Sequence, residues 1–287
     1  MRPAFLLLTP ACVALGVACA TASGAPIQIL DLLLVLFGAT SAHISVNIFN
    51  EYFDYKSGLD SHTRRTPFSG GSGTLQQYPE LAKFTLSTGI ITLGITVLIG
   101  IYFILIQGPM ILPIGLAGLI LIITYTQWVT RHPLLSLLSA GLAFGPLMVL
   151  GTHFALTGEY GFTALLVSFV PFFLANNLLL LNQFPDVDAD NRAGRRTLPI
   201  MLGRHKASII FGIFLLLAYL SISISVVLRY LPSLAALGLL TALLAAPTLA
   251  GVYRHADNIN KLLPYMRLNV LINITTPLLV AVGLYWG

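Results

Sequence analysis

Long apolar runs separated by short polar segments make up most of this chain. Eight stretches contain no charged residue: 3–30, 32–50, 84–130, 132–158, 160–185, 207–228, 230–253 and 268–287. A helix needs about 20 residues to cross the hydrocarbon core of a bilayer, so seven of these stretches fit one crossing each. The stretch 84–130 carries Gly108 and Pro109 near its middle, where a helix breaks and the chain turns back. The pattern therefore predicts nine transmembrane helices.

The composition agrees with this pattern. Of the 287 residues, 56% are hydrophobic and 9% are charged, and the mean hydropathy is +0.88. A water-soluble domain carries about 25% charged residues, which excludes that class of protein. We expect one all-α integral membrane domain over residues 1–287.

The basic residues predict the orientation of the helices. With nine helices, the N-terminus and the even-numbered loops share one face, and 14 of the 15 Lys and Arg residues lie there. Only Arg229 lies on the other side. By the positive-inside rule the basic face, with the N-terminus, is cytoplasmic, and the membrane is expected to be the cytoplasmic membrane of a prokaryote. The pI of about 9.3 then reflects topology and an anionic ligand, and it gives no reason to invoke nucleic acid.

The first apolar stretch also carries the only cysteines. Residues 1–26 fit a first transmembrane helix, and a cleaved signal peptide is the alternative. Cys12 and Cys19 lie seven residues apart at membrane depth. We interpret them as packing residues, because no disulfide framework or zinc site is readable from a single pair.

Two segments on the basic face are long and dense in charge, residues 51–83 and 185–206. They hold seven of the ten acidic residues, namely Glu51, Asp54, Asp60, Glu80, Asp186, Asp188 and Asp190. Loops on a rigid scaffold commonly carry function, so the active site is expected here, on the cytoplasmic side.

The helix that leads into the first segment carries a polar stripe. His43, Asn47, Asn50 and Asp54 project onto one narrow face at 3.6 residues per turn. A polar group facing lipid is costly, so such a stripe faces protein or a cavity. The stripe predicts the lining of a site, and an interhelical hydrogen-bond seam is the alternative.

The sixth helix repeats this arrangement. Asn182, Asp186 and Asp190 are spaced by four and share a face if the helix continues, with Asp188 on the opposite side and Pro185 loosening the helix end. The Asn-x-x-x-Asp pattern recurs at an offset of 132 residues, which is four helices. This repeat predicts two similar half-bundles around a central cavity.

Paired carboxylates at facing helix ends suit a hard cation. Mg²⁺ typically binds through one or two carboxylates plus substrate phosphates. Asp54 and Asp60 are expected to hold one ion, and Asp186 and Asp190 another. Nearby polar and cationic side chains would then bind a diphosphate: Asn47, Lys56, Arg64, Arg65, Arg131, Asn182, Arg195 and Arg196.

Such a site supports the ionisation of an allylic diphosphate, followed by attack of an electron-rich acceptor on the carbocation. An apolar groove open to the bilayer suits a substrate with a charged head and a long apolar tail. Aromatic side chains near the same end are candidates for cation–π stabilisation, or belong to an ordinary interfacial belt: Tyr52, Phe53, Tyr55 and Tyr125.

Residues 50–60 (NEYFDYKSGLD) and 186–199 (DVDADNRAGRRTLP) resemble the two Asp-rich motifs of the UbiA superfamily of intramembrane prenyltransferases. The resemblance implies an all-α fold, Mg²⁺ dependence and transfer of a polyprenyl group to an aromatic acceptor. It implies that Asn50, Asp54, Asp186 and Asp190 are the catalytic ligands of Mg²⁺ and diphosphate.

The first motif has Gly58 where many members have an acid, with the acid at Asp60 instead. This form, and residues 144–152 (FGPLMVLGT), look like the 1,4-dihydroxy-2-naphthoate prenyltransferases of menaquinone synthesis. Other features depart from the family pattern, including Val129 where a Lys often follows Tyr125 at that spacing, Glu51 after Asn50, and the glycine-rich run 65–73.

These departures leave the acceptor open. Dihydroxynaphthoate leads, and 4-hydroxybenzoate, a glycerol phosphate ether lipid, and haem or chlorophyll-type acceptors are the alternatives. A membrane transporter is a remote alternative, disfavoured because the repeats are parallel and the acids gather at one surface. No required protein partner is readable from the sequence.

Overall fold

The computed structural model describes residues 3–59, 63 and 65–287. Asp60 and Arg64, two of the predicted site residues, lie outside the described residues. Within the described ranges the secondary structure is helical, with no strand. The predicted all-α fold is therefore confirmed for this part of the chain.

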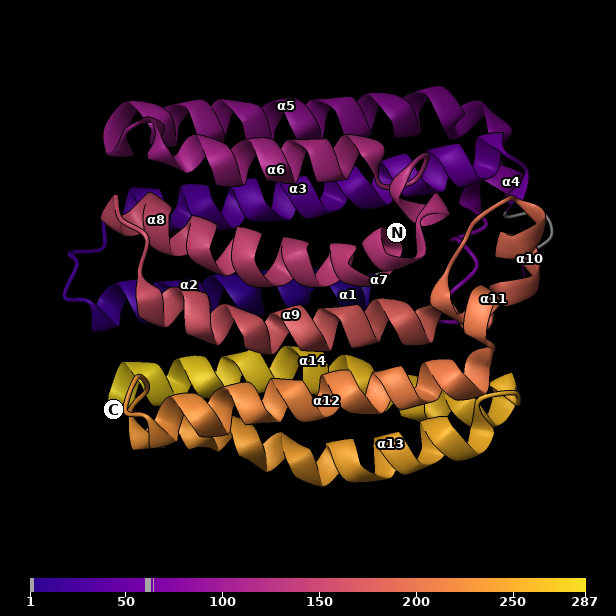
Figure 1. Cartoon of the computed structure of the whole chain (residues 1–287). Coiled ribbons are helices and arrows are strands. Elements are labelled where there is room, and N and C mark those ends of the chain that lie inside the picture. Colours follow the sequence, from indigo (N-terminus) through magenta and orange to yellow (C-terminus); the bar gives the residue numbers. More distant parts are fainter. Residues whose placement is uncertain (1–2, 60–62, 64) are drawn as a thin grey trace.

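The helices run side by side as one bundle (Figure 1). The longer helices are α2 (Leu8–Ala22), α3 (Ile29–Lys56), α5 (Ala82–Gln107), α6 (Leu112–Thr124), α9 (Phe162–Asn182), α12 (Arg204–Val227), α13 (Ala242–His255) and α14 (Ile259–Trp286). One further rod is continuous through α7 (Pro133–Leu142), the π-helical η5 (Ala143–Leu150) and α8 (Gly151–Thr157). The short elements are α1 (Pro3–Leu6), α4 (Thr74–Gln77), η2 (Pro79–Leu81), η3 (Pro109–Ile111), η4 (Val129–Arg131), α10 (Val187–Arg192), α11 (Leu198–Leu202) and η6 (Ser233–Thr241).

Seven helical stretches among the described residues are long and apolar enough to cross a membrane. Two shorter apolar helices, Leu8–Ala22 and Pro109–Thr124, lie where the other two predicted spans were placed. Their 15 and 16 residues fall below the length of about 20 that a full crossing usually needs. The number nine, and the orientation relative to the cytoplasm, therefore remain predictions.

The break predicted inside the longest apolar stretch is confirmed. Gly108 has a φ of 91°, a conformation that side-chain-bearing residues avoid, and its N–H closes α5 by donating to the carbonyl of Ile104 at 3.0 Å. Pro109 then starts η3. The chain reverses there, so α6 runs back in the direction opposite to α5 (Figure 1).

Alternating helix directions bring the two charged segments to one end of the bundle. The helices α3, α6 and α9 finish at this end, where α4, α10 and α11 also lie (Figure 1). We call it the polar end, defined by residues 51–83 and 185–206. The predicted juxtaposition of these two segments is confirmed.

The helix α2 lies inside the bundle and packs against α14, η5 and α8. Cys12 and Cys19 are free thiols in its core, with exposures of 0% and 2%. Their interpretation as packing residues is confirmed. The outer helices α5 and α6 instead leave large apolar side chains such as Leu105 and Ile120 exposed, as expected for a surface that faces lipid.

The helices α7 and α9 approach each other closely at Gly141. Its backbone N–H donates to the Asn176 side chain at 2.6 Å, and an added Cβ would collide with the Phe172 carbonyl and with Asn176 itself. The absence of a side chain at Gly141 therefore lets these two helices touch.

We predict that Gly141→Ala destabilises the protein by about 1–3 kcal/mol, because the methyl group overpacks a backbone contact. Thermal unfolding in detergent measures the effect. Gly118→Ala is the matched control, since nothing lies within 4 Å of the added Cβ on α6. Equal melting temperatures of the two variants would contradict this packing.

Candidate functional site

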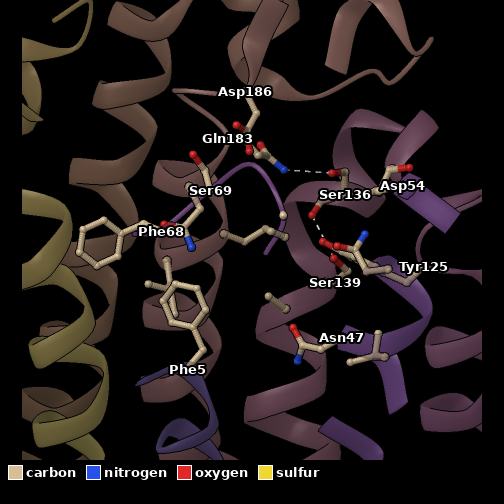
Figure 2. Close-up of a pocket in the computed structure, with 18 of the residues that line it drawn as sticks. Phe5, Asn47, Asp54, Phe68, Ser69, Tyr125, Ser136, Ser139, Gln183 and Asp186 are labelled. Carbon is tan, nitrogen blue, oxygen red and sulfur yellow. Dashed lines mark hydrogen bonds between the residues drawn. The ribbon is translucent and has the colours of Figure 1, made fainter. Parts of the chain in front are cut away.

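A cavity of about 270 Å³ opens at the polar end of the bundle. Its walls come from α3, the segment 68–72, α7, α9 and the α10 region. Figure 2 shows acidic and amide side chains such as Asp54, Gln183 and Asp186 at one end of this cavity, and Phe5 at the other. The cavity is thus acidic toward the polar end and mainly apolar toward the bundle interior, where Asn47 and His43 are its polar lining residues.

The stripe on α3 lines this cavity as predicted. His43, Asn47, Asn50 and Asp54 all contribute to the wall. Asn47 donates to the carbonyl of His43 at 2.8 Å, and Asn50 reaches the Thr126 hydroxyl at 3.4 Å. The hydrogen bonds of the two Asn side chains orient them while leaving them at the cavity surface.

The second motif lines the same cavity with a different backbone. The sixth helix does not continue through Asp190: α9 ends at Asn182 and α10 begins at Val187, so the predicted interruption near Pro185 is confirmed. Pro185 supplies no N–H to extend a helix. Asn182, Asp186 and Asp190 nevertheless all reach the cavity, whereas Asp188 is exposed to solvent.

Arg195 joins the two motifs. Its guanidinium donates to Asp190 at 2.9 Å through Nη1 and to Asp54, 141 residues away in the chain, through Nη2, so one cation bridges a carboxylate from each motif. Gly194, with a φ of 74°, ends α10 and turns the chain so that the N–H of Arg195 donates to the carbonyl of Asp190 at 3.0 Å. The local turn therefore aims Arg195 back over the acids.

Burial and charge shift the ionisation of these groups in opposite directions. Burial raises the pKa of Asp190, and the positive charge of Arg195 opposes that rise. Burial lowers the pKa of Arg195, but the charges of Asp54 and Asp190 outweigh it and leave that pKa raised. Burial also raises the pKa of Tyr125 at the cavity wall to about 12. Near neutral pH, Arg195 is a cation and Tyr125 a neutral phenol.

The predicted diphosphate-binding cations separate into two groups. Lys56 and Arg131 line a second cavity that shares Asp54 and Arg195 with the first. Arg65 and Arg196 line neither of these cavities, and both side chains are exposed. The geometry therefore connects only the first group, with Arg195, to the acidic site.

The glycine-rich run forms part of the cavity wall. Thr66 accepts hydrogen bonds from the N–H groups of Phe68 and Ser69, which folds the segment back on itself. Ser72 ties it to α3 by donating to Glu51 through both its N–H and its hydroxyl. The residue that departs from the usual family motif thus anchors this loop over the cavity.

Sequence reasoning missed part of the wall on α7. Ser136 and Ser139 face the cavity, and Gln183 donates to the Ser136 hydroxyl at 3.2 Å (Figure 2). Two hydroxyls three residues apart in an otherwise apolar helix were the available signal. Of the four aromatic candidates, Tyr125 lines the first cavity, Phe53 lines the second, and Tyr52 and Tyr55 line neither.

The donor atoms suit a hard cation. Carboxylate and amide oxygens of Asp54, Asp186, Asp190 and Asn182 line one cavity, and Mg²⁺ prefers oxygen ligands. Among the described residues, no three Asp, Glu, His or Cys side chains are gathered closely enough to hold a metal by themselves. The set therefore fits an ion that takes only one or two carboxylates and completes its shell with other oxygens.

Residues 7–271 match the profile of the UbiA prenyltransferase family. The chain is 29% identical over 64% of its length to a Bacillus subtilis protein named 1,4-dihydroxy-2-naphthoate octaprenyltransferase, and 28% identical over 67% to a Haemophilus influenzae protein of the same name. It is 30% identical over 81% to the UbiA prenyltransferase domain-containing protein 1 of Xenopus tropicalis. These matches cover 58%, 63% and 66% of the relatives, so the chain spans less than two thirds of each.

Two solved structures share the fold. The apo structure of a UbiA homologue from Aeropyrum pernix K1 superposes with a TM-score of 0.74 at 17% identity, over 99% of this chain and 98% of that one. A UbiA homologue from Archaeoglobus fulgidus bound to DMAPP and Mg²⁺ gives a TM-score of 0.55 at 15% identity, over 98% and 99%. The predicted resemblance in fold is confirmed.

We predict that Arg195→Gln destabilises the protein by about 3 kcal/mol, because it removes the guanidinium that bridges two largely buried carboxylates. The comparison is Asp257→Asn, which removes the partner of Arg204 from an exposed ion pair spanning 4.0 Å and should cost at most about 1 kcal/mol. Thermal unfolding of both variants in the same detergent, without added Mg²⁺, measures the difference. A smaller loss for Arg195→Gln than for Asp257→Asn would refute the bridging role.

Proposed function

The chain belongs to the UbiA prenyltransferase family, and from this premise we propose that it transfers a polyprenyl group from an allylic polyprenyl diphosphate to an aromatic acceptor, with Mg²⁺ as cofactor. The observation that carries the proposal is the convergence of both Asp-containing motifs on one cavity whose far end is mainly apolar. A charged head and an apolar tail are both accommodated by such a cavity.

The diphosphate belongs at the polar end. Asp54, Asp186 and Asp190 are the residues that would hold Mg²⁺, with Asn50 and Asn182 beside them on the same wall. Asp60, outside the described residues, belongs to the same proposal. Bound Mg²⁺ neutralises the diphosphate and stabilises the negative charge that develops on it as it leaves.

Arg195 has a second role in this scheme. Its two carboxylate partners are the residues proposed to bind the metal, so substrate and cation compete with the guanidinium for them. A guanidinium binds phosphate as well as carboxylate, and its planar donors allow it to exchange one partner for the other. We propose that Arg195 holds the two motifs together before substrate binds and then donates to the bound diphosphate, assisted by Lys56 and Arg131 from the second cavity.

The reaction breaks the allylic C–O bond of the prenyl diphosphate and releases diphosphate. An acceptor ring carbon then forms the new C–C bond to the allylic carbon. The ring becomes aromatic again when that carbon loses its own substituent, which is usually a proton. The cavity assists by excluding water from the carbocation, and the phenol of Tyr125 offers a π face near the polar end. Ala175, Leu178 and Leu179 on α9 form an apolar wall for the first part of the tail.

We propose 1,4-dihydroxy-2-naphthoate as the acceptor. The support is the similarity to the two octaprenyltransferases of that name and the form of the first motif, with Gly58. 4-Hydroxybenzoate, a glycerol phosphate ether lipid, and haem or chlorophyll-type acceptors are the alternatives. We propose that the polar end faces the cytoplasm of a prokaryotic cell, in line with 14 of 15 basic residues being assigned to that face.

We predict that Asp54→Asn and Asp186→Asn each lower prenyl transfer by at least about 10³-fold, because a neutral amide cannot replace a metal-binding carboxylate in stabilising the leaving group. Asp188→Asn is the matched control, since that carboxylate is solvent-exposed within the same motif. Products are identified by mass after incubation with Mg²⁺, prenyl diphosphates of several lengths and the acceptors named above. Wild-type-like turnover in both cavity variants would contradict the proposal.

Metal removal gives an independent prediction. Treatment with EDTA should abolish product formation, and excess Mg²⁺ should restore it, because diphosphate is a poor leaving group until its charge is neutralised. The rate is followed by the release of diphosphate and by product mass. Full activity in EDTA would show that Arg195 and its neighbouring cations suffice without a metal.

A further inference from the structure

His43 is a polar side chain in the middle of a membrane-spanning helix. It is the fifteenth of the 28 residues of α3, its exposure is 7%, and it lines the first cavity, the one that holds both Asp-containing motifs. Ionisable side chains at this depth are costly and usually face a functional cavity. The reaction scheme above assigns no role to it.

Two contacts fix the orientation of the imidazole. Nδ1 hydrogen-bonds the hydroxyl of Thr9 on α2 at 2.7 Å. Phe144 of η5 meets the ring edge-on, with centroids 4.9 Å apart and an interplanar angle of 79°. The side chain is therefore held from two neighbouring elements, and its ring plane is set before any substrate binds.

The other ring nitrogen, Nε2, has no such contact. Among the residues that the structure describes, Thr9 is the only hydrogen-bond partner of the imidazole. The Nε2 atom is not fully enclosed by protein atoms. Because His43 is 7% exposed and lines this cavity, we infer that the accessible surface of Nε2 opens to the cavity. A polar atom held rigidly at membrane depth and aimed into a cavity points to a ligand that hydrogen-bonds it.

The position of His43 indicates which part of the substrate pair it meets. Eleven residues separate it from Asp54 on α3, or about 16 Å along the helix axis, so it lies too deep to bind the diphosphate. The prenyl tail offers no hydrogen-bonding atom, and the apolar wall of α9 suits it better. The acceptor is the remaining candidate, reaching from the reacting carbon toward the cavity interior.

Accordingly, and resting on the proposed function, we propose that His43 is an acceptor-binding residue whose Nε2 hydrogen-bonds an aromatic hydroxyl of the acceptor. A hydroxyl both donates and accepts, so it matches either tautomer of the imidazole, which depends on whether the Thr9 hydroxyl donates or accepts. This contact would orient the ring so that one carbon faces the allylic cation. Acceptor recognition would then be separate from diphosphate recognition.

Two substitutions separate the nitrogens. Asn places its amide near the position of Nδ1, so His43→Asn keeps the bond to Thr9 and loses the contact in the cavity. Gln reaches the position of Nε2, so His43→Gln keeps the cavity contact and loses the bond to Thr9. Thr9→Val removes the partner of Nδ1 and leaves Nε2 in place.

The test measures KM for dihydroxynaphthoate and for the polyprenyl diphosphate in wild type and these three variants. We expect His43→Asn to raise the acceptor KM by about tenfold, the loss of one hydrogen bond, with the diphosphate KM unchanged. His43→Gln should stay within about threefold of wild type. In wild type, naphthoates that lack the contacted hydroxyl should have a higher KM than dihydroxynaphthoate. For these hydroxyl-deleted acceptors, wild type and His43→Asn should have the same KM.

The inference is overturned if His43→Asn, His43→Gln and Thr9→Val all raise the acceptor KM equally. That result would mean that His43 serves only to hydrogen-bond α3 to α2. Should His43→Asn fail to fold, the hydroxyl-deleted acceptors tested on wild type and His43→Gln decide the question, because an unchanged KM would refute the contact. A wild-type protein that prenylates none of the acceptors contradicts the proposed function itself. Turnover without sensitivity at His43 contradicts only this inference.

Discussion

The ion triplet of Arg195 with Asp54 and Asp190 is the interaction on which the polar end depends. It joins the last turn of α3 to the α10 segment, two parts of the chain that the helical bundle alone does not connect at this point. Carboxylates this deeply buried repel each other and are costly to desolvate, so a cation must lie between them when no metal does. The same groups that hold the two motifs together are those proposed to bind substrate, which couples stability to ligand binding at one site.

The remainder of the bundle is built under a different constraint. Within a bilayer every backbone polar group must be satisfied internally, and the described spans meet this with helices. One of these rods departs from regular α-helix. In the rod after α7, the π-helical η5 contains Pro146, which has no N–H to donate, and the widened turn carries Phe144 to the cavity beside His43. Gly141, one turn earlier, allows the close contact with α9 that fixes this wall.

The cavity combines two surfaces that recognise different chemistry. The α3 stripe runs from the acid Asp54 through Asn50 and Asn47 to His43. Only its outer end carries a carboxylate, but its side chains remain polar as far as membrane depth. The α9 wall is apolar until Asn182. A substrate with a charged head, an apolar tail and a polar aromatic partner has a complementary region for each part, and the reacting atoms would meet where the two walls converge on the acids.

The sequence by itself determined the helical membrane fold, the break at Gly108, the cavity stripe on α3 and the meeting of the two acidic segments, because apolar run length and the 3.6-residue period are local properties. It located Asn182, Asp186 and Asp190 and an interruption near Pro185, but whether Pro185 kinks the helix or ends it depends on what surrounds it. Only the tertiary structure decided that Arg195 bridges the acids, that Arg65 and Arg196 line neither cavity, and that Ser136 and Gln183 line the first. Partners separated by 141 residues along the chain leave no local pattern, because their contact is set by how whole helices pack rather than by any period within one of them.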